Sequence, residues 1–222
     1  MNTFENLGIS PQLVKVLPEL GFVLPTEIQK EAIPLLINND CDFIGLANTG
    51  TGKTAAFGLP LLNAIDTTKR HVQALVVAPT RELCQQIATQ MEAFAKYMPQ
   101  LKIAVVYGGA NITRQISDLK AGAQVVVATP GRLIDLLKRK ALKLDVITNV
   151  VLDEADEMLN MGFQEDLTEI LKNTPAEKRT WLFSATMPKE VERIARNYMS
   201  HPTELSTGKK NEGADNLEHI YY

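Results

Sequence analysis

A chain of 222 residues, of which 45% are apolar, is long enough to bury a substantial core as one large domain. Its formal net charge of −3 argues against nucleic-acid binding driven by overall positive charge. Any contact with nucleic acid must therefore come from local arginines and backbone amides. The chain has no signal-peptide pattern and no apolar run near the ~18 residues of a membrane span. Cys41 and Cys84 lack the spacing of a metal site. We therefore expect a cytoplasmic protein with reduced, buried thiols and no membrane partner.

Helical and strand-like segments alternate along the chain. One helix should begin at Ser10-Pro11 and stop at Gly21, and the next should begin at Thr26, where Gln29 completes a capping box. Strands are expected near 41–47, 74–78, 102–107, 124–128, 149–153, 180–184 and, from a weaker pattern, 203–206. Helices are expected near 53–65, 80–97, 111–120, 130–139, 163–172 and 188–199. Apolar β-branched runs separated by helices predict a doubly wound α/β domain, with a mostly parallel sheet and helices on both faces.

The unusual segments of the sequence fall where strands end. The predicted strands run into ANTGTGKT, APTRE, YGG, ATPGR, LDEAD and SAT. Ligands of open parallel sheets bind beyond the carboxyl ends of the strands. All of these segments should therefore meet at one edge of the sheet.

The segment ANTGTGKT (residues 47–54) matches the P-loop pattern between a strand and a helix. Its glycines let consecutive backbone N–H groups point at phosphate oxygens, and the following helix start adds its positive dipole end. Lys53 should reach the β- and γ-phosphates, and the Thr54 hydroxyl should bind Mg²⁺. The residues predicted to bind the phosphates are Thr49, Gly50, Thr51, Gly52, Lys53 and Thr54.

Four carboxylates follow the apolar run at 149–152: Asp153, Glu154, Asp156 and Glu157. The simplest interpretation is a helix start, because the helix dipole favours acidic residues in a first turn. A Mg²⁺–triphosphate, however, needs a carboxylate at a neighbouring strand end, and Asp153 is placed as a Walker-B acid that binds the metal partly through water. Glu154 can then orient or deprotonate the attacking water. Asp156 stays open at this point, and Glu157 keeps the helix-start interpretation.

Together these segments resemble the motifs of the DEAD-box RNA helicases. Residues 153–156 spell the motif that names the family, 21–29 with the upstream Phe4 are similar to its adenine-recognition motif, and 184–186 resemble the motif that couples hydrolysis to unwinding. The resemblance implies a RecA-like P-loop NTPase domain with ATP and Mg²⁺ as cofactors, and single-stranded or duplex RNA bound without sequence specificity. It also implies ATP contacts at Phe4 and Gln29, RNA contacts at Thr80, Arg81, Gly109, Thr129, Gly131 and Arg132, and coupling through Asp156, Ser184 and Thr186.

Several of these residues have a second interpretation. Gln29 can pair with the N6 amine and N7 of adenine, or it can simply complete the capping box. Phe4 can stack on the base or close a small N-terminal core. Thr80 and Thr129 are good N-cap residues, so ordinary capping competes with RNA contact. The run Lys138-Arg139-Lys140 reads as a solvated helix end and not as an RNA contact.

Members of the resembled family have a second RecA-like domain, whose arginines complete the ATP site. We expect residues 1–206 to form the N-terminal RecA-like domain, with the adenine motif inside 4–29, and residues 207–222 to lead toward an interdomain linker, the second domain being absent. The sequence thus predicts the ATP-binding half of an RNA helicase, which alone binds nucleotide weakly and is nearly inactive. A clamp that binds without turnover and a DNA translocase are the rival hypotheses.

Overall fold

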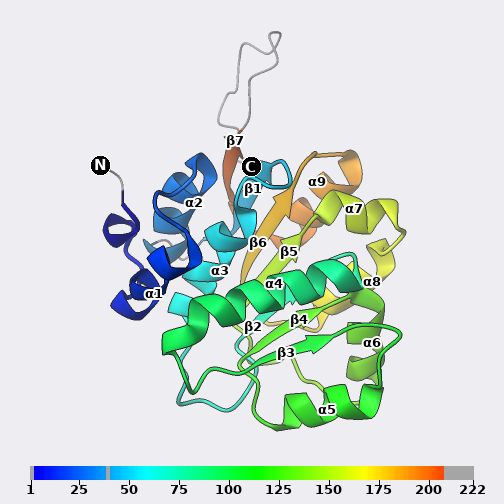
Figure 1. Ribbon diagram of the computed structural model, residues 1–222. Helices are drawn as coiled ribbons and strands as arrows, with labels where there is room; N and C mark the ends of the chain where they lie inside the picture. Colours follow the sequence, from blue (N-terminus) through cyan, green and yellow to red (C-terminus); the bar gives the residue numbers. More distant parts are fainter. Residues whose placement is uncertain (1–2, 39–40, 208–222) are drawn as a thin grey trace.

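The computed structural model describes residues 3–38 and 41–207 and forms a layered α/β domain (Figure 1). Its strands are β1 (Phe43–Ala47), β2 (Ala74–Val77), β3 (Ile103–Val106), β4 (Val125–Ala128), β5 (Asn149–Asp153), β6 (Arg179–Ser184) and β7 (Thr203–Thr207). Its α-helices are α1 (Pro11–Val16), α2 (Glu27–Asn38), α3 (Lys53–Asn63), α4 (Arg81–Phe94), α5 (Ile112–Lys120), α6 (Pro130–Lys138), α7 (Ala155–Asn160), α8 (Gln164–Lys172) and α9 (Lys189–Tyr198). Among the described residues, no helix has both the length and the apolar character to cross a bilayer.

The strands form one seven-stranded sheet in the order β3-β4-β2-β5-β6-β1-β7. Every pairing in it is parallel. All strands therefore end at the same edge of the sheet, as the sequence pattern predicted. The predicted parallel α/β sheet is confirmed.

Helices cover both faces of the sheet. The core on one face joins α1 to α4 to alternate strand residues such as Val76 and Val127. The core on the other face joins α5 to α9 to the residues between them, such as Leu75 and Val126. Both faces of each central strand are therefore buried, which explains why the strands read as continuous apolar runs and not as alternating patterns.

The structure differs from the predicted elements in a few places. The first helix is broken into α1 and a 3₁₀ turn (Pro18–Leu20), and Gly21 ends that turn with φ +81°, a conformation that suits glycine. The helix expected over 80–97 ends as an α-helix at Phe94 and continues as a 3₁₀ turn. The short helix α7 is an additional element, and it starts inside the acidic segment. The tail predicted to lead toward a linker lies, except for residue 207, outside the described residues.

Candidate active site

Strand order sorts the motifs along the edge of the sheet. The segments that follow β3, β4 and β2 lie on one half of the edge, and those that follow β5, β6 and β1 lie on the other. The first half, named the RNA half for this prediction, carries all the residues predicted to contact RNA. The second, named the nucleotide half, carries the P-loop and the acidic and SAT segments. Two separate ligands could thus bind side by side on one edge.

The expectation that Asp153 ends a strand neighbouring the P-loop strand is wrong. Strand β6 lies between β5 and β1, and it pairs with both of them. Asp153 and Gly45 both pair with Phe183, so they lie at one level of the sheet and two strand spacings apart, about 10 Å. That separation leaves room for phosphate oxygens and a metal ion between the loop and the carboxylate.

Two glycines give the P-loop its shape. Gly50 has φ +83° and Gly52 has φ +93°, which is the left-handed region that other residues rarely adopt. A Cβ built on Gly52 would lie 2.3 Å from Nε2 of Gln29, so the close approach of the neighbouring segment also requires glycine here. Thr51 steadies the turn by donating its hydroxyl hydrogen bond to the carbonyl of Asn48 (2.8 Å).

The start of α2 holds the P-loop from outside. The Thr26 hydroxyl donates to the carbonyl of Thr51 (2.9 Å), and Nε2 of Gln29 donates to the carbonyl of Gly52 (3.1 Å). The predicted capping box is only half formed: Oε1 of Gln29 accepts from the backbone N–H of Thr26 (3.0 Å), but the Thr26 hydroxyl donates to the loop. Gln29 is buried, so it caps the helix and supports the loop at the same time.

The structure places Phe4 in the N-terminal core. Its ring is 4% exposed and meets the ring of Phe22 edge to face, with the centroids 6.3 Å apart. Phe22 packs in turn against Phe94 of α4. Phe4 therefore has the packing role that was one of its two interpretations.

Lys53 and Asp153 are two buried charges of the nucleotide half. Nζ of Lys53 is buried and has no hydrogen-bond partner among the described residues. Burial raises the pKa of Asp153 to about 6, and the attraction of Lys53 offsets only part of that rise. A buried cation without a partner beside the glycine turn fits a phosphate group, and a buried carboxylate opposite it fits a hard cation.

Glu154 follows Asp153 in an unusual backbone conformation. With φ +52° and ψ +52° it is left-handed although it is not glycine, and it precedes the first turn of α7. Its Oε1 accepts a hydrogen bond from the Thr49 hydroxyl of the P-loop (3.4 Å). Such strain is typical of functional sites, and here it turns the Glu154 side chain toward the phosphate loop. The helix-start interpretation of the acidic segment is also correct, because Asp156 and Glu157 lie in the first turn of α7.

Asp156 joins the acidic segment to the SAT segment. Oδ2 of Asp156 accepts from the backbone N–H (2.9 Å) and the hydroxyl (2.7 Å) of Thr186, and the backbone N–H of Asp156 donates to the Ser184 hydroxyl (3.2 Å). Partial burial pushes the pKa of Asp156 upward, but the bonds from Thr186 and Ser184 outweigh it and hold the pKa below its ordinary value. Asp156 is therefore in direct contact with Ser184 and Thr186, the other two residues predicted to couple hydrolysis to unwinding.

The residues predicted to contact RNA lie on the other half of the edge. The Thr80 hydroxyl caps α4 by accepting from the N–H of Leu83 (3.1 Å), while Thr129 makes no side-chain capping bond in the part of the chain that the structure describes. Gly109 and Gly131 are exposed. The guanidinium of Arg81 lies over the ring of Tyr107, 4.8 Å from its centroid.

Arg132 is partly engaged within the protein. Nη1 donates to Oε1 of Gln115 (2.7 Å), and both Nη1 and Nη2 donate to the carbonyl of Ala110 (3.2 and 3.3 Å). Sequence reasoning missed Gln115, although a signal was present. Residues Ile112, Gln115, Ile116 and Leu119 have helical i, i+3, i+4, i+7 spacing, so a polar side chain stands in the apolar stripe of α5.

A model of the family described as DEAD/DEAH box helicase matches residues 26–194, which include every motif of both halves except the N-terminal part of the adenine motif. The chain belongs to the DEAD/DEAH box helicase family.

Relatives of known name agree with this assignment. The "ATP-dependent RNA helicase DeaD" of Haemophilus influenzae is 46% identical over 216 residues, which is 97% of this chain and 35% of that protein. The "DEAD-box ATP-dependent RNA helicase CshA" of Geobacillus kaustophilus is 46% identical over 221 residues, which is 100% of this chain and 47% of that protein. The chain thus spans less than half the length of these curated relatives.

Solved structures of DEAD-box proteins share the fold. A DEAD box protein from Methanococcus jannaschii has a TM-score of 0.87 at 39% identity, over 92% of this chain and 55% of that chain. A hypothetical ATP-dependent RNA helicase from Sulfolobus tokodaii has a TM-score of 0.83 at 37% identity, over 90% of this chain and 57% of that chain. The RecA-like fold that the motifs implied is confirmed.

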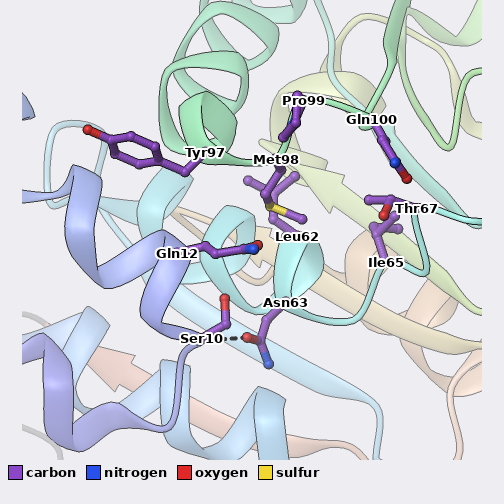
Figure 2. Close-up of a pocket in the computed structure, with 10 residues that line it drawn as sticks. All are labelled: Ser10, Gln12, Leu62, Asn63, Ile65, Thr67, Tyr97, Met98, Pro99 and Gln100. Carbon is purple, nitrogen blue, oxygen red and sulfur yellow. Dashed lines mark hydrogen bonds between the residues drawn. The ribbon is translucent and has the colours of Figure 1, made fainter.

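A hollow of about 450 Å³ lies away from these helicase motifs, where the C-terminal end of α3 meets α1 and the segment after α4 (Figure 2). Asn63 at the end of α3 accepts from the N–H of Ser10 there (2.8 Å). Its lining combines amides and hydroxyls with apolar side chains, and it includes none of the predicted site residues. The helicase motifs therefore define the candidate active site, and this hollow is not part of it.

Proposed function

We propose that this chain is the ATP-binding half of an ATP-dependent RNA helicase, in which RNA-stimulated ATP hydrolysis is coupled to local duplex unwinding. One observation carries the proposal: the buried Nζ of Lys53, without a hydrogen-bond partner among the described residues, stands at the P-loop opposite a buried carboxylate. A protein interior does not keep such a cation without a ligand that compensates its burial, and phosphate is the ligand that a glycine turn and a helix start also favour.

The chain's own groups divide the work on the nucleotide. Lys53 neutralises the β- and γ-phosphates, and the backbone amides of 49–54 hold the phosphate oxygens in place. Thr54 and Asp153 would hold Mg²⁺, which when bound neutralises charge that develops on the phosphates. Glu154 accepts a proton from the attacking water or orients that water, from the position that its left-handed backbone and Thr49 give it.

Gln29 is the group that selects adenine in this proposal. Its amide has used one acceptor site on Thr26 and one donor on Gly52, and an amide side chain offers two donors and a carbonyl with two lone pairs. One donor and one acceptor site therefore remain for the N6 amine and N7 of adenine. The packing of Phe4 against Phe22 supports the segment that leads into α2, the helix that carries Gln29, and base stacking by Phe4 requires its ring to become accessible.

On the other half of the edge, RNA is held by its backbone. The exposed amides near Gly109 and Gly131 and the guanidinium groups of Arg81 and Arg132 suit phosphates, and contacts of this kind do not read sequence. The bonds between Asp156 and Thr186 lie on the nucleotide half, and they supply a contact through which hydrolysis can be sensed.

This half of the enzyme should be nearly inactive alone. An arginine finger is worth about 10³–10⁵ in rate, and family members carry such arginines on the second RecA-like domain. Arg81 and Arg132 stand on the RNA half, across the edge from the P-loop. We infer that residues 1–222 bind adenine nucleotide weakly, hydrolyse ATP slowly and unwind no duplex.

The test compares ATP hydrolysis by this chain and by its full-length parent, each with single-stranded RNA, with DNA and with no nucleic acid. The proposal expects RNA-stimulated turnover by the parent and almost none by the 222 residues. Stimulation by DNA alone would favour a translocase, and tight nucleotide binding by the parent without turnover would favour a clamp. Robust RNA-dependent hydrolysis by the isolated chain would refute the view that it is an incomplete enzyme.

A further inference from the structure

Gln115 of α5 lies on the RNA half, between Arg132 and Tyr107, and outside every motif considered above. It is a buried polar side chain, 5% exposed. Its Oε1 accepts from Nη1 of Arg132 (2.7 Å), and its Nε2 donates to the backbone carbonyl of Tyr107 (3.1 Å). One side chain therefore connects the first turn of α6 with the end of β3.

These two bonds fix the loop that contains Gly108 and Gly109. Gln115 holds the carbonyl of Tyr107 before the glycine pair, and Arg132 holds the carbonyl of Ala110 after it. The glycines themselves are exposed, and a Cβ built on either would meet no atom of the described residues within 4 Å. The space beside the two glycines is open, so we expect the conformation of the loop to depend on the hydrogen bonds at Tyr107 and Ala110.

The same hydrogen-bond network reaches the segment after β2, which carries Arg81. The ring of Tyr107 lies under the guanidinium of Arg81, and its hydroxyl accepts from Nε2 of Gln85 (2.8 Å). Arg81, the glycine pair and Arg132 thus converge on Tyr107 and Gln115. An amide suits the central position because it accepts from a cation with one atom and donates to a carbonyl with the other, which an aliphatic or a charged side chain cannot do.

We propose that Gln115 is a positioning residue for RNA binding: it holds the Gly108–Gly109 loop and the Arg132 guanidinium in one fixed arrangement that matches successive phosphates. The inference rests on the proposed binding of RNA at this edge. Arg132 keeps N–H groups beyond those bonded to Gln115 and Ala110, and a guanidinium fixed in orientation loses less freedom when it binds a phosphate.

The experiment replaces the amide with an unbranched side chain of similar length, Gln115→Met. The matched control is Gln124→Met, because Gln124 is also buried and also donates to backbone carbonyls, those of Thr67 and Lys69, at the opposite edge of the sheet. Isotope-labelled chain is titrated with decauridine and, separately, with Mg·ADP, and the backbone order of the glycine amides is measured by NMR relaxation.

For Gln115→Met we expect about tenfold weaker decauridine binding, the loss typical of one hydrogen bond to a charged group, with unchanged affinity for Mg·ADP. The amides of Gly108 and Gly109 should become more mobile. In an Arg132→Met background the same substitution should weaken RNA binding by much less, because the two side chains act as a unit. Gln124→Met should change none of these readouts.

Unchanged RNA affinity in Gln115→Met, or an equal loss in Gln124→Met, would overturn the positioning role. If the losses of RNA affinity in Gln115→Met and Arg132→Met simply add in the double variant, the two side chains do not act together. If the unmodified chain shows no shift at the glycine amides with decauridine, RNA contact at this edge is refuted along with the role that Gln115 plays in it. Relaxation of the glycine amides then shows separately whether Gln115 orders the loop.

Discussion

Removing the charge of Asp153 should stabilise the domain in the absence of nucleotide. Burial raises the pKa of this carboxyl from 3.8 to about 6 in the folded chain, even with Lys53 nearby. Each pKa unit corresponds to about 1.4 kcal/mol, so an ionised Asp153 at pH 8 lowers the free energy of unfolding by about 3 kcal/mol relative to a neutral one. Asp153→Asn keeps an oxygen for the bond from the N–H of Glu154 (3.0 Å) and carries no charge.

The pH dependence of unfolding tests directly whether Asp153→Asn stabilises the domain. Below about pH 4 the carboxyl is protonated in both the folded and the unfolded chain, and the variant should match the unmodified protein. Between about pH 4 and 6 the unfolded chain is ionised at this carboxyl while the folded chain still holds its proton, so the stability provided by the protonated Asp153 falls and is fully lost above about pH 6. The advantage of Asp153→Asn should therefore grow between about pH 4 and 6 and then level off.

Urea unfolding from pH 4 to pH 8, without Mg²⁺ or nucleotide, measures this difference. Asp156→Asn is the matched control, because hydrogen bonds hold the pKa of Asp156 below its ordinary value and its neutral form should destabilise the domain at pH 8. Mg·ADP should stabilise the unmodified chain and have little effect on Asp153→Asn. An Asp153→Asn variant that is less stable than the unmodified chain at pH 8 would refute the reasoning.

Three further substitutions test the site. Lys53→Ala should abolish Mg·ATP binding in calorimetry. Its circular dichroism spectrum should be unchanged, because no described residue bonds to Nζ of Lys53. Unchanged nucleotide affinity would remove the P-loop assignment. Gln29→Ala should reduce the discrimination between ATP and GTP, since a lost hydrogen bond at a buried polar site costs about 1–3 kcal/mol; equal affinity of the unmodified chain for both nucleotides would leave Gln29 only its structural role. Thr186→Val should raise the pKa of Asp156 toward its ordinary value, as followed by carboxyl NMR titration, because the hydroxyl bond to Oδ2 is removed; an unaltered titration would contradict the coupling contact.

The sequence predicted the elements of the fold but not the order of its strands. Buried parallel strands read as continuous apolar runs, and every strand that this pattern indicated is present in the sheet. Runs such as ALVV in β2, VVVA in β4 and NVVLD in β5 carry nearly the same information, so they do not specify which strands are neighbours. That is why the place of β6, between the P-loop strand and the strand of Asp153, came only from the structure.

The site residues divide in the same way. Lys53 and Asp153 belong to local motifs whose chemistry can be read from consecutive residues, and the structure buries both at the expected edge. Gln115 acts on Arg132 and Tyr107, which are distant in sequence, and only folding brings the three together. The left-handed backbone of Glu154 was equally hidden, because a residue that is not glycine rarely adopts this conformation and no sequence pattern marks it.

The place of β6 also bears on the proposed coupling between the nucleotide and the RNA. Ser184, the last residue of β6, pairs with Leu46 at the end of the P-loop strand, and its hydroxyl accepts from the N–H of Asp156. The SAT segment is therefore joined to the strand that leads into the P-loop through the sheet, and to the acidic segment through hydrogen bonds. If Lys53 and Asp153 bind a Mg²⁺-bound phosphate as proposed, that ligand offsets the cost of burying both charges. In this proposal the effect arises on both sides of β6, so loss of the phosphate should alter the contact between Asp156 and Thr186, which lies just beyond the end of β6.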